Sequence, residues 1–265
     1  MTNSKQANAF DQTVFQIAGE FNKIPNYEKS MEDPELRAMH TFIAIGMAGI
    51  VESRNLVSAS FVPATNKAIV KTRQMLRKSV YANMLGNIDD NLEDLRDETV
   101  RLGYVFTFHK FESFIKQLIK MLDERQDTNT GTPLDKFAEK EFGFSPYQWF
   151  KNPAVHLVNF ISNCTKHQDG YCRLDNPKFS IPYEFKSHSQ DEKIVRTVKQ
   201  YQVDIQNLID QITLLITVIT SLYQFRTALY FLSDDMFNED IGAQAIAQLT
   251  SIKPSVYKKI EEYCQ

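Results

Sequence analysis

The most constraining feature of this 265-residue chain is an apolar repeat in its C-terminal third. Between residues 194 and 222, apolar side chains recur in alternating steps of four and three residues. Such steps keep side chains on one side of an α-helix, so the repeat predicts a long helix. A flanking apolar line widens this side, which favours a multi-helix core or an extensive dimer interface over a narrow zipper. The repeat comprises Ile194, Val198, Tyr201, Ile205, Leu208, Ile212, Leu215, Ile219 and Leu222, flanked by Ile209, Ile216 and Tyr223.

The middle of the chain predicts a second long helix, from Asp89 to about Arg125. Acidic side chains crowd its first turns, where they interact favourably with the positive end of the helix dipole. Aromatic and aliphatic residues then follow at spacings of four and three, which places them on one core-facing side. These residues are Tyr104, Phe108, Phe111, Ile115, Leu118 and Leu122.

Two further helices are predicted on the N-terminal side. The segment from about Glu35 to Ser60 is apolar and rich in small residues, which indicates a tightly packed interior helix. Pro63 ends that helix or starts the next one, because proline fits the first helical turn. Residues Asn66–Leu85 then continue as an amphipathic basic helix that Gly86 stops.

Composition supports one fold class. Hydrophobic residues make up 43% of the chain, which is enough for a packed body, whereas 9 Gly and 9 Pro are few for a chain with many tight turns. We therefore predict an all-α fold, a bundle of long antiparallel helices with an N-terminal helical extension. The expected organisation is an N-terminal helical region over 1–88 packed on a bundle over 89–265, or one continuous domain.

Charge is distributed unevenly along a chain whose formal net charge is −3. Between Arg54 and Ile88 every charged residue is basic, and an acidic stretch follows from Asp89 to Glu98. We favour adjacent helices that pair these charges over a nucleic-acid groove, because the chain as a whole has no basic field. The basic residues are Arg54, Lys67, Lys71, Arg73, Arg77 and Lys78.

The cysteines and the apolar stretches bear on localisation. Cys164, Cys172 and Cys264 form no disulfide framework and suit a reducing compartment. The N-terminus lacks the charged start and apolar core of a signal peptide. The stretch His40–Val51 is too short to span a membrane and Ile212–Leu232 carries polar and charged residues, so both are interpreted as buried helix. We expect a cytoplasmic protein with no membrane partner.

Residues that could carry chemistry concentrate between Asn163 and Gly170. They end a predicted amphipathic helix, for which Asn152-Pro153 is a plausible start because a capping side chain precedes a first-turn proline. Asn163 and His167 share one face four residues apart, and Gly170 stops the helix. On residue types alone, an exposed polar helix end is the favoured interpretation.

The functional interpretation of the same residues is metal-free RNA cleavage. That reaction needs a group to take the ribose 2′-hydroxyl proton, a group to protonate the departing oxygen, and a cation for the charged phosphorane. His167 suits the proton transfer because the histidine pKa lies near neutrality. Lys166 suits the charge, and Asn163 the positioning of His167 or of the phosphate.

Other chemistries have weaker support. Cys164, His167 and Cys172, with His156 further upstream, form an incomplete zinc set, and Cys164 falls on the apolar stripe. Glycine-rich phosphate loops, the serine-hydrolase elbow and the zinc-protease motif have no counterpart in the sequence. We predict no metal and no other cofactor.

The run from Asn163 to Gly170 resembles the C-terminal-helix motif of HEPN domains, the higher eukaryotes and prokaryotes nucleotide-binding superfamily. That motif is an arginine, then a polar residue, then a histidine four to six positions after the arginine. His167 matches the histidine and Asn163 the polar residue, while Ser162 stands at the arginine position. Upstream, Phe108–Phe114 is similar to the aromatic-and-glutamate pattern of an early HEPN helix, so the resemblance covers about Asp89–Phe231.

The resemblance implies an all-α domain that binds or cleaves RNA in a bacterial toxin–antitoxin, CRISPR or antiphage defence system. It also implies a homodimer whose active site forms where two such helices meet, and a partner protein of the same system. Glu112 and His109 are then supporting residues that face the cleft, with a surface His–Glu pair as the alternative. The second hypothesis is a non-catalytic helical scaffold that dimerises through the Ile194–Leu222 repeat.

Overall fold

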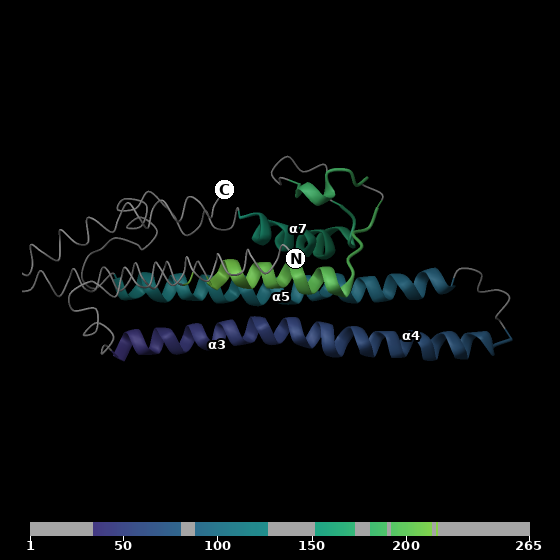
Figure 1. The fold of residues 1–265 in the computed structure, drawn as a ribbon, viewed down its shortest axis with the longest axis horizontal. Helices are drawn as coiled ribbons and strands as arrows, with labels where there is room; N and C mark the ends of the chain where they lie inside the picture. Colours follow the sequence, from purple (N-terminus) through teal and green to yellow (C-terminus); the bar gives the residue numbers. More distant parts are fainter. Residues whose placement is uncertain are drawn as a thin grey trace, which may run out of the picture. The chain divides into compact units, whose positions relative to one another are not determined.

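The computed structural model describes residues 34–80, 88–126, 152–172, 181–189, 192–213 and 216 (Figure 1). This part of the chain is built from packed helices and contains no β-strand, which confirms the predicted all-α class. Its one extended pairing is an isolated antiparallel bridge between Tyr171 and Lys193. The basic helix predicted over Asn66–Leu85 is shorter than expected, since it ends at Arg77, and the predicted stop at Gly86 lies outside the described residues.

The helices agree closely with the apolar patterns. The predicted helix from Asp89 to Arg125 is α5 (Ile88–Gln126), and the helix after Asn152 is α7 (Pro153–Gln168), which starts at Pro153 as expected. The C-terminal repeat forms a helix over 198–213, so the prediction of a helix from Ile194 is wrong for residues 194–197. Reciprocal hydrogen bonds between Thr197 and Gln200 cap the helix at its start. The other elements are α3 (Pro34–Leu56), the π-helix η1 (Val57–Phe61), α4 (Val62–Arg77) and the 3₁₀ turn η4 (Tyr183–Phe185).

The chain divides into two compact units, each assembled from separate stretches of sequence. The first unit comprises residues 1–45, 115–152 and 210–265, and the second comprises residues 46–114 and 153–209. The second unit contains residues from both sides of position 88, and the boundary predicted there stays a prediction. Among the described residues of the first unit, the buried apolar side chains are Met39, Ile115, Leu118, Ile212 and Ile216.

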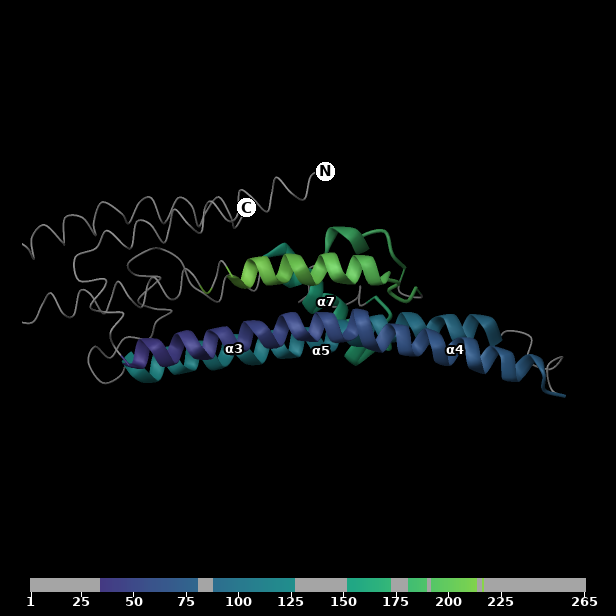
Figure 2. The same cartoon turned by 60° about the horizontal axis from the view of Figure 1, so that its bottom comes forward.

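The core of the second unit forms where α5 packs between the α3–α4 run and the helix over 198–213. Hydrogen bonds join Ser53 to Thr107 and Thr65 to Thr99, so residue numbers rise along one helix as they fall along the other. The α3–α4 run is therefore antiparallel to α5, as Figure 1 and Figure 2 also show. The buried α5 residues in this unit include Val100, Tyr104, Phe108, Phe111 and Phe114.

Most of the described part of the C-terminal repeat lies in the core, with Val198 half-buried. Ile194, Tyr201, Ile205 and Leu208 are each 0% exposed within a single chain. The ring of Tyr201 packs edge-on against that of Tyr104, with 5.0 Å between centroids. This part of the repeat is therefore not available as a dimer interface; its continuation at Leu215, Ile219 and Leu222 lies outside the described residues.

The α3–α4 run is continuous, although Pro63 interrupts its backbone hydrogen bonding. Proline lacks the N–H that an α-helix needs, and the turn before it widens into the π-helix Val57–Phe61. The wider turn places Val57 and Val62, five residues apart, on the same buried side. Pro63 thus opens α4 without ending the helical run.

The prediction of an interior helix over residues 35–60 is wrong for the outer side of α3. Ile45 is 69% exposed and Ala44 and Ala48 are exposed as well, because the helix packs through one side only.

By length and composition alone, the helical run Arg37–Arg77 could cross a membrane, and 17% of its most apolar 18-residue window is buried. The same run donates hydrogen bonds from Ser53 to Thr107 and from Arg54 to Gln206, so its inner side belongs to the helix bundle.

Gly103 is expected to be essential for the close packing of α5. A Cβ at this position would lie 2.6 Å from Cγ1 of Val57 and 3.3 Å from the Tyr201 ring. Gly103→Ala should therefore lower the free energy of unfolding by about 1–3 kcal/mol, measured by urea denaturation. Gly49→Ala is the matched control: nothing lies within 4 Å of its Cβ position, so it should stabilise its helix by about 0.5–1 kcal/mol. Equal effects of the two substitutions would contradict this packing.

Candidate functional site at the end of α7

Helix α7 presents an apolar side to the bundle and a polar side to solvent. The predicted apolar stripe of this helix consists of Ala154, Leu157, Val158, Ile161 and Cys164, and all of these except the half-buried Ala154 are buried. A second contact comes from Phe160, whose ring stacks on Phe185 of η4 at 5.4 Å between centroids. The helix is therefore fixed along its length, and its polar side is held in one orientation.

Helix α7 ends close to the predicted position. Its last residue is Gln168, and Asp169 and Gly170 adopt positive φ angles of 52° and 85°. The N–H of Gly170 donates to the carbonyl oxygen of Cys164, six residues back, at 3.1 Å. Gly170 therefore belongs to the left-handed turn that ends the helix, but the first residue of that turn is Asp169 and not the predicted glycine.

A buried arginine anchors this helix end. Arg101 of α5 is 2% exposed, and its side chain lies where a Cβ on Gly170 would come within 2.7 Å of its Nε. Arg101 donates to the carbonyl oxygen of Ile194 at 3.2 Å and to Oδ1 of Asp94 at 2.9 Å. The carbonyl oxygen of Gly170 accepts the N–H of Ile194 at 2.8 Å. We call Asp94, Arg101, Gly170, Lys193 and Ile194 the Arg101 cluster.

Ion pairs extend the Arg101 cluster to the surface. Nζ of Lys193 lies 3.0 Å from Oδ2 of Asp94, 3.5 Å from Oδ2 of Asp169 and 5.4 Å from the centre of the Tyr171 ring. The hydrogen bond from Arg101 lowers the pKa of Asp94, and the hydrogen bond to Asp94 raises the pKa of Lys193. Both groups therefore stay charged at neutral pH and hold the segment around residue 193 against the end of α7.

The Arg101 cluster was not predicted, although the sequence carries a signal for it. Arg101 stands three residues before Tyr104 and seven before Phe108, so it occupies a position on the apolar stripe of α5. A charged residue on a core stripe implies a buried partner. The identity of that partner depends on tertiary contacts with residues 169–194, which no local pattern encodes.

The predicted site residues occupy the outer side of this helix end. His167 and Lys166 are exposed, and Asn163 is half-buried one turn before them. Nδ2 of Asn163 donates to Oδ1 of Asn159 at 2.9 Å, and no described hydrogen bond joins Asn163 to His167. Ser162, at the position of the HEPN arginine, is 0% exposed, and its Oγ has no hydrogen-bond partner among the described residues.

The two supporting candidates lie on α5. His109 is exposed and Glu112 is half-buried. None of the described hydrogen bonds or ion pairs connects either residue to Asn163, Lys166 or His167. Their role at a shared cleft stays a prediction.

The described part of the chain contains no candidate metal-binding site. No group of three or more histidine, cysteine, aspartate or glutamate side chains is arranged there to hold an ion. Cys164 and Cys172 are buried thiols, and burial raises the pKa of Cys172 to about 11. Burial therefore disfavours the thiolate form of Cys172 that metal binding or nucleophilic attack requires.

A second buried polar group positions η4 beside α7. The hydroxyl of Tyr104 donates to Oδ2 of Asp204 at 2.6 Å, and Nε of Arg196 lies 3.7 Å from the same oxygen. The Arg196 guanidinium lies 5.0 Å from the centre of the Phe185 ring. Burial raises the pKa values of Asp204 and of Tyr104. These contacts connect α5 and the helix over 198–213 to the aromatic pair that supports α7.

Comparison of the chain with protein-family models, with curated proteins and with solved structures gave no match. The resemblance to HEPN domains therefore rests on the motif residues of α7 and on the aromatic pattern of α5.

Proposed function

We propose that this protein is a HEPN-like RNA-binding protein that cleaves RNA by metal-independent acid–base chemistry. The observation that carries the proposal is the exposure of His167 and Lys166 on one helix turn whose end is fixed by the Arg101 cluster. A catalytic group works best when the surrounding structure holds it in place before substrate arrives. Lys166 and His167 also lie in the last turn of α7, where the helix dipole favours cations.

The proposed reaction is transfer of the phosphorus from one ribose oxygen to another. The 2′-oxygen attacks phosphorus as a base removes its proton, and the bond to the 5′-oxygen breaks as an acid protonates that oxygen. The products are a 2′,3′-cyclic phosphate and a free 5′-hydroxyl. His167 transfers a proton, Lys166 stabilises the negative charge on the phosphorane, and Asn163 binds the phosphate.

A homodimer completes the site in this proposal. One chain supplies one histidine at the end of α7, whereas the reaction needs a base and an acid at the same time. Two copies that bring their α7 ends together supply both groups. The defence or toxin context of the resemblance is part of the same proposal.

The test is cleavage of a labelled RNA by the purified full chain in the presence of a metal chelator. His167→Ala should slow cleavage by about 10²–10⁴-fold, the usual contribution of a general acid or base. Gln168→Ala, also exposed on the same turn, is the matched control and should cleave at the wild-type rate. Circular dichroism checks that both variants keep their helix content.

Two results would overturn the proposal. One is wild-type cleavage by His167→Ala, which would remove the proposed proton-transfer group. The other is a purified wild-type chain that leaves every tested RNA intact, which would favour the non-catalytic scaffold.

A further inference from the structure

One side of α4 carries a straight line of basic and amide side chains. Lys67, Lys71 and Gln74 of α4, and Lys78 at its C-cap, follow at spacings of four, three and four residues, so they form one ridge along the helix and its end. Eleven residues of helix extend the ridge over roughly 16 Å. Val62 and Ile69 are the buried residues of α4, and the ridge lies on the opposite side, directed away from α5. We call these four residues the lysine ridge.

None of the ion pairs described in the second unit joins an acidic side chain to the lysine ridge. The nearest acidic stretch in sequence is the start of α5, but Asp94 there pairs with Arg101 and Lys193, and Asp97 pairs with Arg96. Among the described ion pairs, none involves Lys67, Lys71 or Lys78. The described side chains therefore show no pairing of the acidic stretch with these three lysines, which are exposed to solvent.

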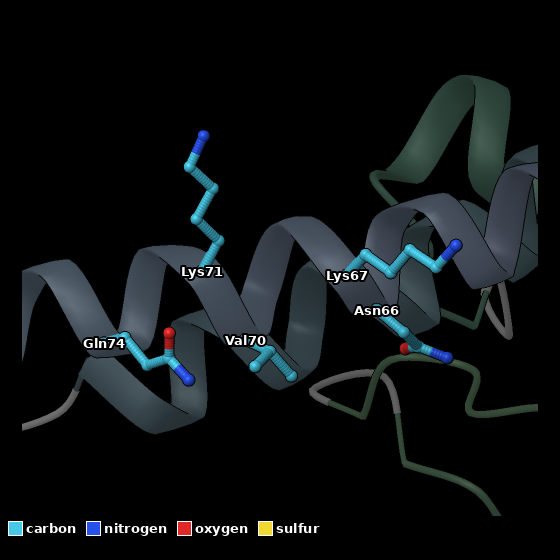
Figure 3. Close-up of a pocket in the computed structure, with 5 residues that line it drawn as sticks. All are labelled: Asn66, Lys67, Val70, Lys71 and Gln74. Atoms are coloured by element: carbon cyan, nitrogen blue, oxygen red, sulfur yellow. The ribbon is translucent and has the colours of Figure 1, made fainter.

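A shallow hollow accompanies the ridge (Figure 3). Its volume is about 330 Å³, at the low end for small-ligand sites, and it is lined by Asn66, Lys67, Val70, Lys71 and Gln74. In Figure 3 the side chain of Lys71 extends away from the helix and that of Lys67 runs along it, while Val70 lies between the amides of Gln74 and Asn66. Val70 is 51% exposed and provides an apolar surface between these polar groups.

The arrangement fits the backbone of a nucleic acid better than a lipid surface. A helix that lies in a membrane directs apolar side chains deepest and keeps lysines at its flanks. On α4 the order is reversed: lysines form the outermost line, and the exposed Val70 and Met75 lie to either side of it. Lysines in a row bind phosphates as point charges, while amides bond to sugars and base edges.

We propose that the lysine ridge and its hollow bind the sugar–phosphate backbone of RNA. This proposal rests on the proposed function, since RNA is the substrate there. It assigns α4 to sequence-independent binding and leaves the chemistry to the end of α7.

The experiment measures binding of the full chain to a labelled single-stranded RNA whose 2′-hydroxyls are methylated, so that cleavage cannot occur. In the variant Lys67→Gln/Lys71→Gln/Lys78→Gln, the slope of log K against log salt should become shallower by about 2. At 0.1 M salt the affinity should fall by roughly 100-fold, and at 0.5 M salt by about fourfold.

The matched control is Lys110→Gln/Lys186→Gln/Lys199→Gln, which removes the same charge from exposed lysines elsewhere in the second unit. It should keep the wild-type slope. Wild-type binding by the ridge variant, or an equal loss in both triple variants, would overturn the proposal. So would a ridge variant that loses only its binding to vesicles of anionic lipid, because that result assigns the surface to a membrane.

Separate measurements of RNA binding and of RNA cleavage distinguish the failure of the lysine-ridge proposal from the failure of the proposed catalytic function. His167→Ala should bind the methylated RNA as tightly as the wild type if the lysine ridge is the docking surface. Loss of cleavage with intact binding leaves both proposals standing. Intact cleavage by His167→Ala, together with the ridge effect on binding, removes the proposed catalytic role alone.

Discussion

Leu208→Asp is expected to unfold the second unit rather than to separate subunits. Leu208 is 0% exposed inside the chain's own core, so the substitution removes its apolar contacts and buries a carboxylate that has no counter-charge. Loss of the side chain alone costs about 2–5 kcal/mol, and the buried carboxylate adds several more. The total is comparable with the whole stability of a typical domain, about 5–15 kcal/mol. Far-UV circular dichroism should show a large loss of helix.

The control for this substitution lies next to it. Asn207 is exposed on the same helix, so Asn207→Asp adds the same carboxylate to the surface and should change stability by less than about 0.5 kcal/mol. A folded Leu208→Asp protein that elutes as a smaller species in size-exclusion chromatography would instead identify this position as a subunit interface. That outcome would revive the scaffold hypothesis for the C-terminal repeat.

Gly170→Ala is expected to lower the free energy of unfolding by about 2–5 kcal/mol. At φ 85° a Cβ costs about 1–2 kcal/mol, and displacement of the neighbouring guanidinium adds about 1–3 kcal/mol. Arg101 cannot move away freely, because it is buried and holds Asp94 and the carbonyl oxygen of Ile194. Thermal unfolding followed by circular dichroism should show a midpoint lower by roughly 5–15 °C.

Asp169→Gly at the preceding position separates backbone strain from this contact. Asp169 also has a positive φ, but its side chain is 78% exposed and its ion pair with Lys193 is weak. Glycine relieves the backbone strain there, so stability should change by less than about 1 kcal/mol, in the stabilising direction. If Gly170→Ala were as mild as Asp169→Gly, the close contact with Arg101 would contribute nothing to the helix end.

The sequence predicted the elements whose apolar spacing is regular. Local patterns predict the long helix from Asp89 and the start of α7 at Pro153, and both are present; α7 leaves the helical conformation at Asp169, one residue before the predicted Gly170. Such features depend on residues within one or two turns of each other. The one-sided burial of α3 was not predicted, because small apolar residues such as Ala44 and Ala48 suit an interior helix and an exposed one equally.

The candidate site was predictable in part. Exposure of Lys166 and His167 follows from their position opposite the buried stripe of α7. The bond from Asn163 to Asn159 and the burial of Arg101 against Gly170 did not follow from spacing, because they depend on rotamers and on contacts across the fold. A residue type shows what a group can do chemically, whereas its partners are decided by packing.

The π-helix Val57–Phe61 has a consequence for the surface of α4. One additional residue in a helical turn rotates everything downstream by about 100° around the axis. That rotation seats Val62 and Ile69 in the core, and by the same geometry it directs Lys67, Lys71 and Lys78 outward. The direction in which the lysine ridge points therefore depends on the additional residue in the π-helix before Pro63. This residue lies upstream of every lysine in the ridge.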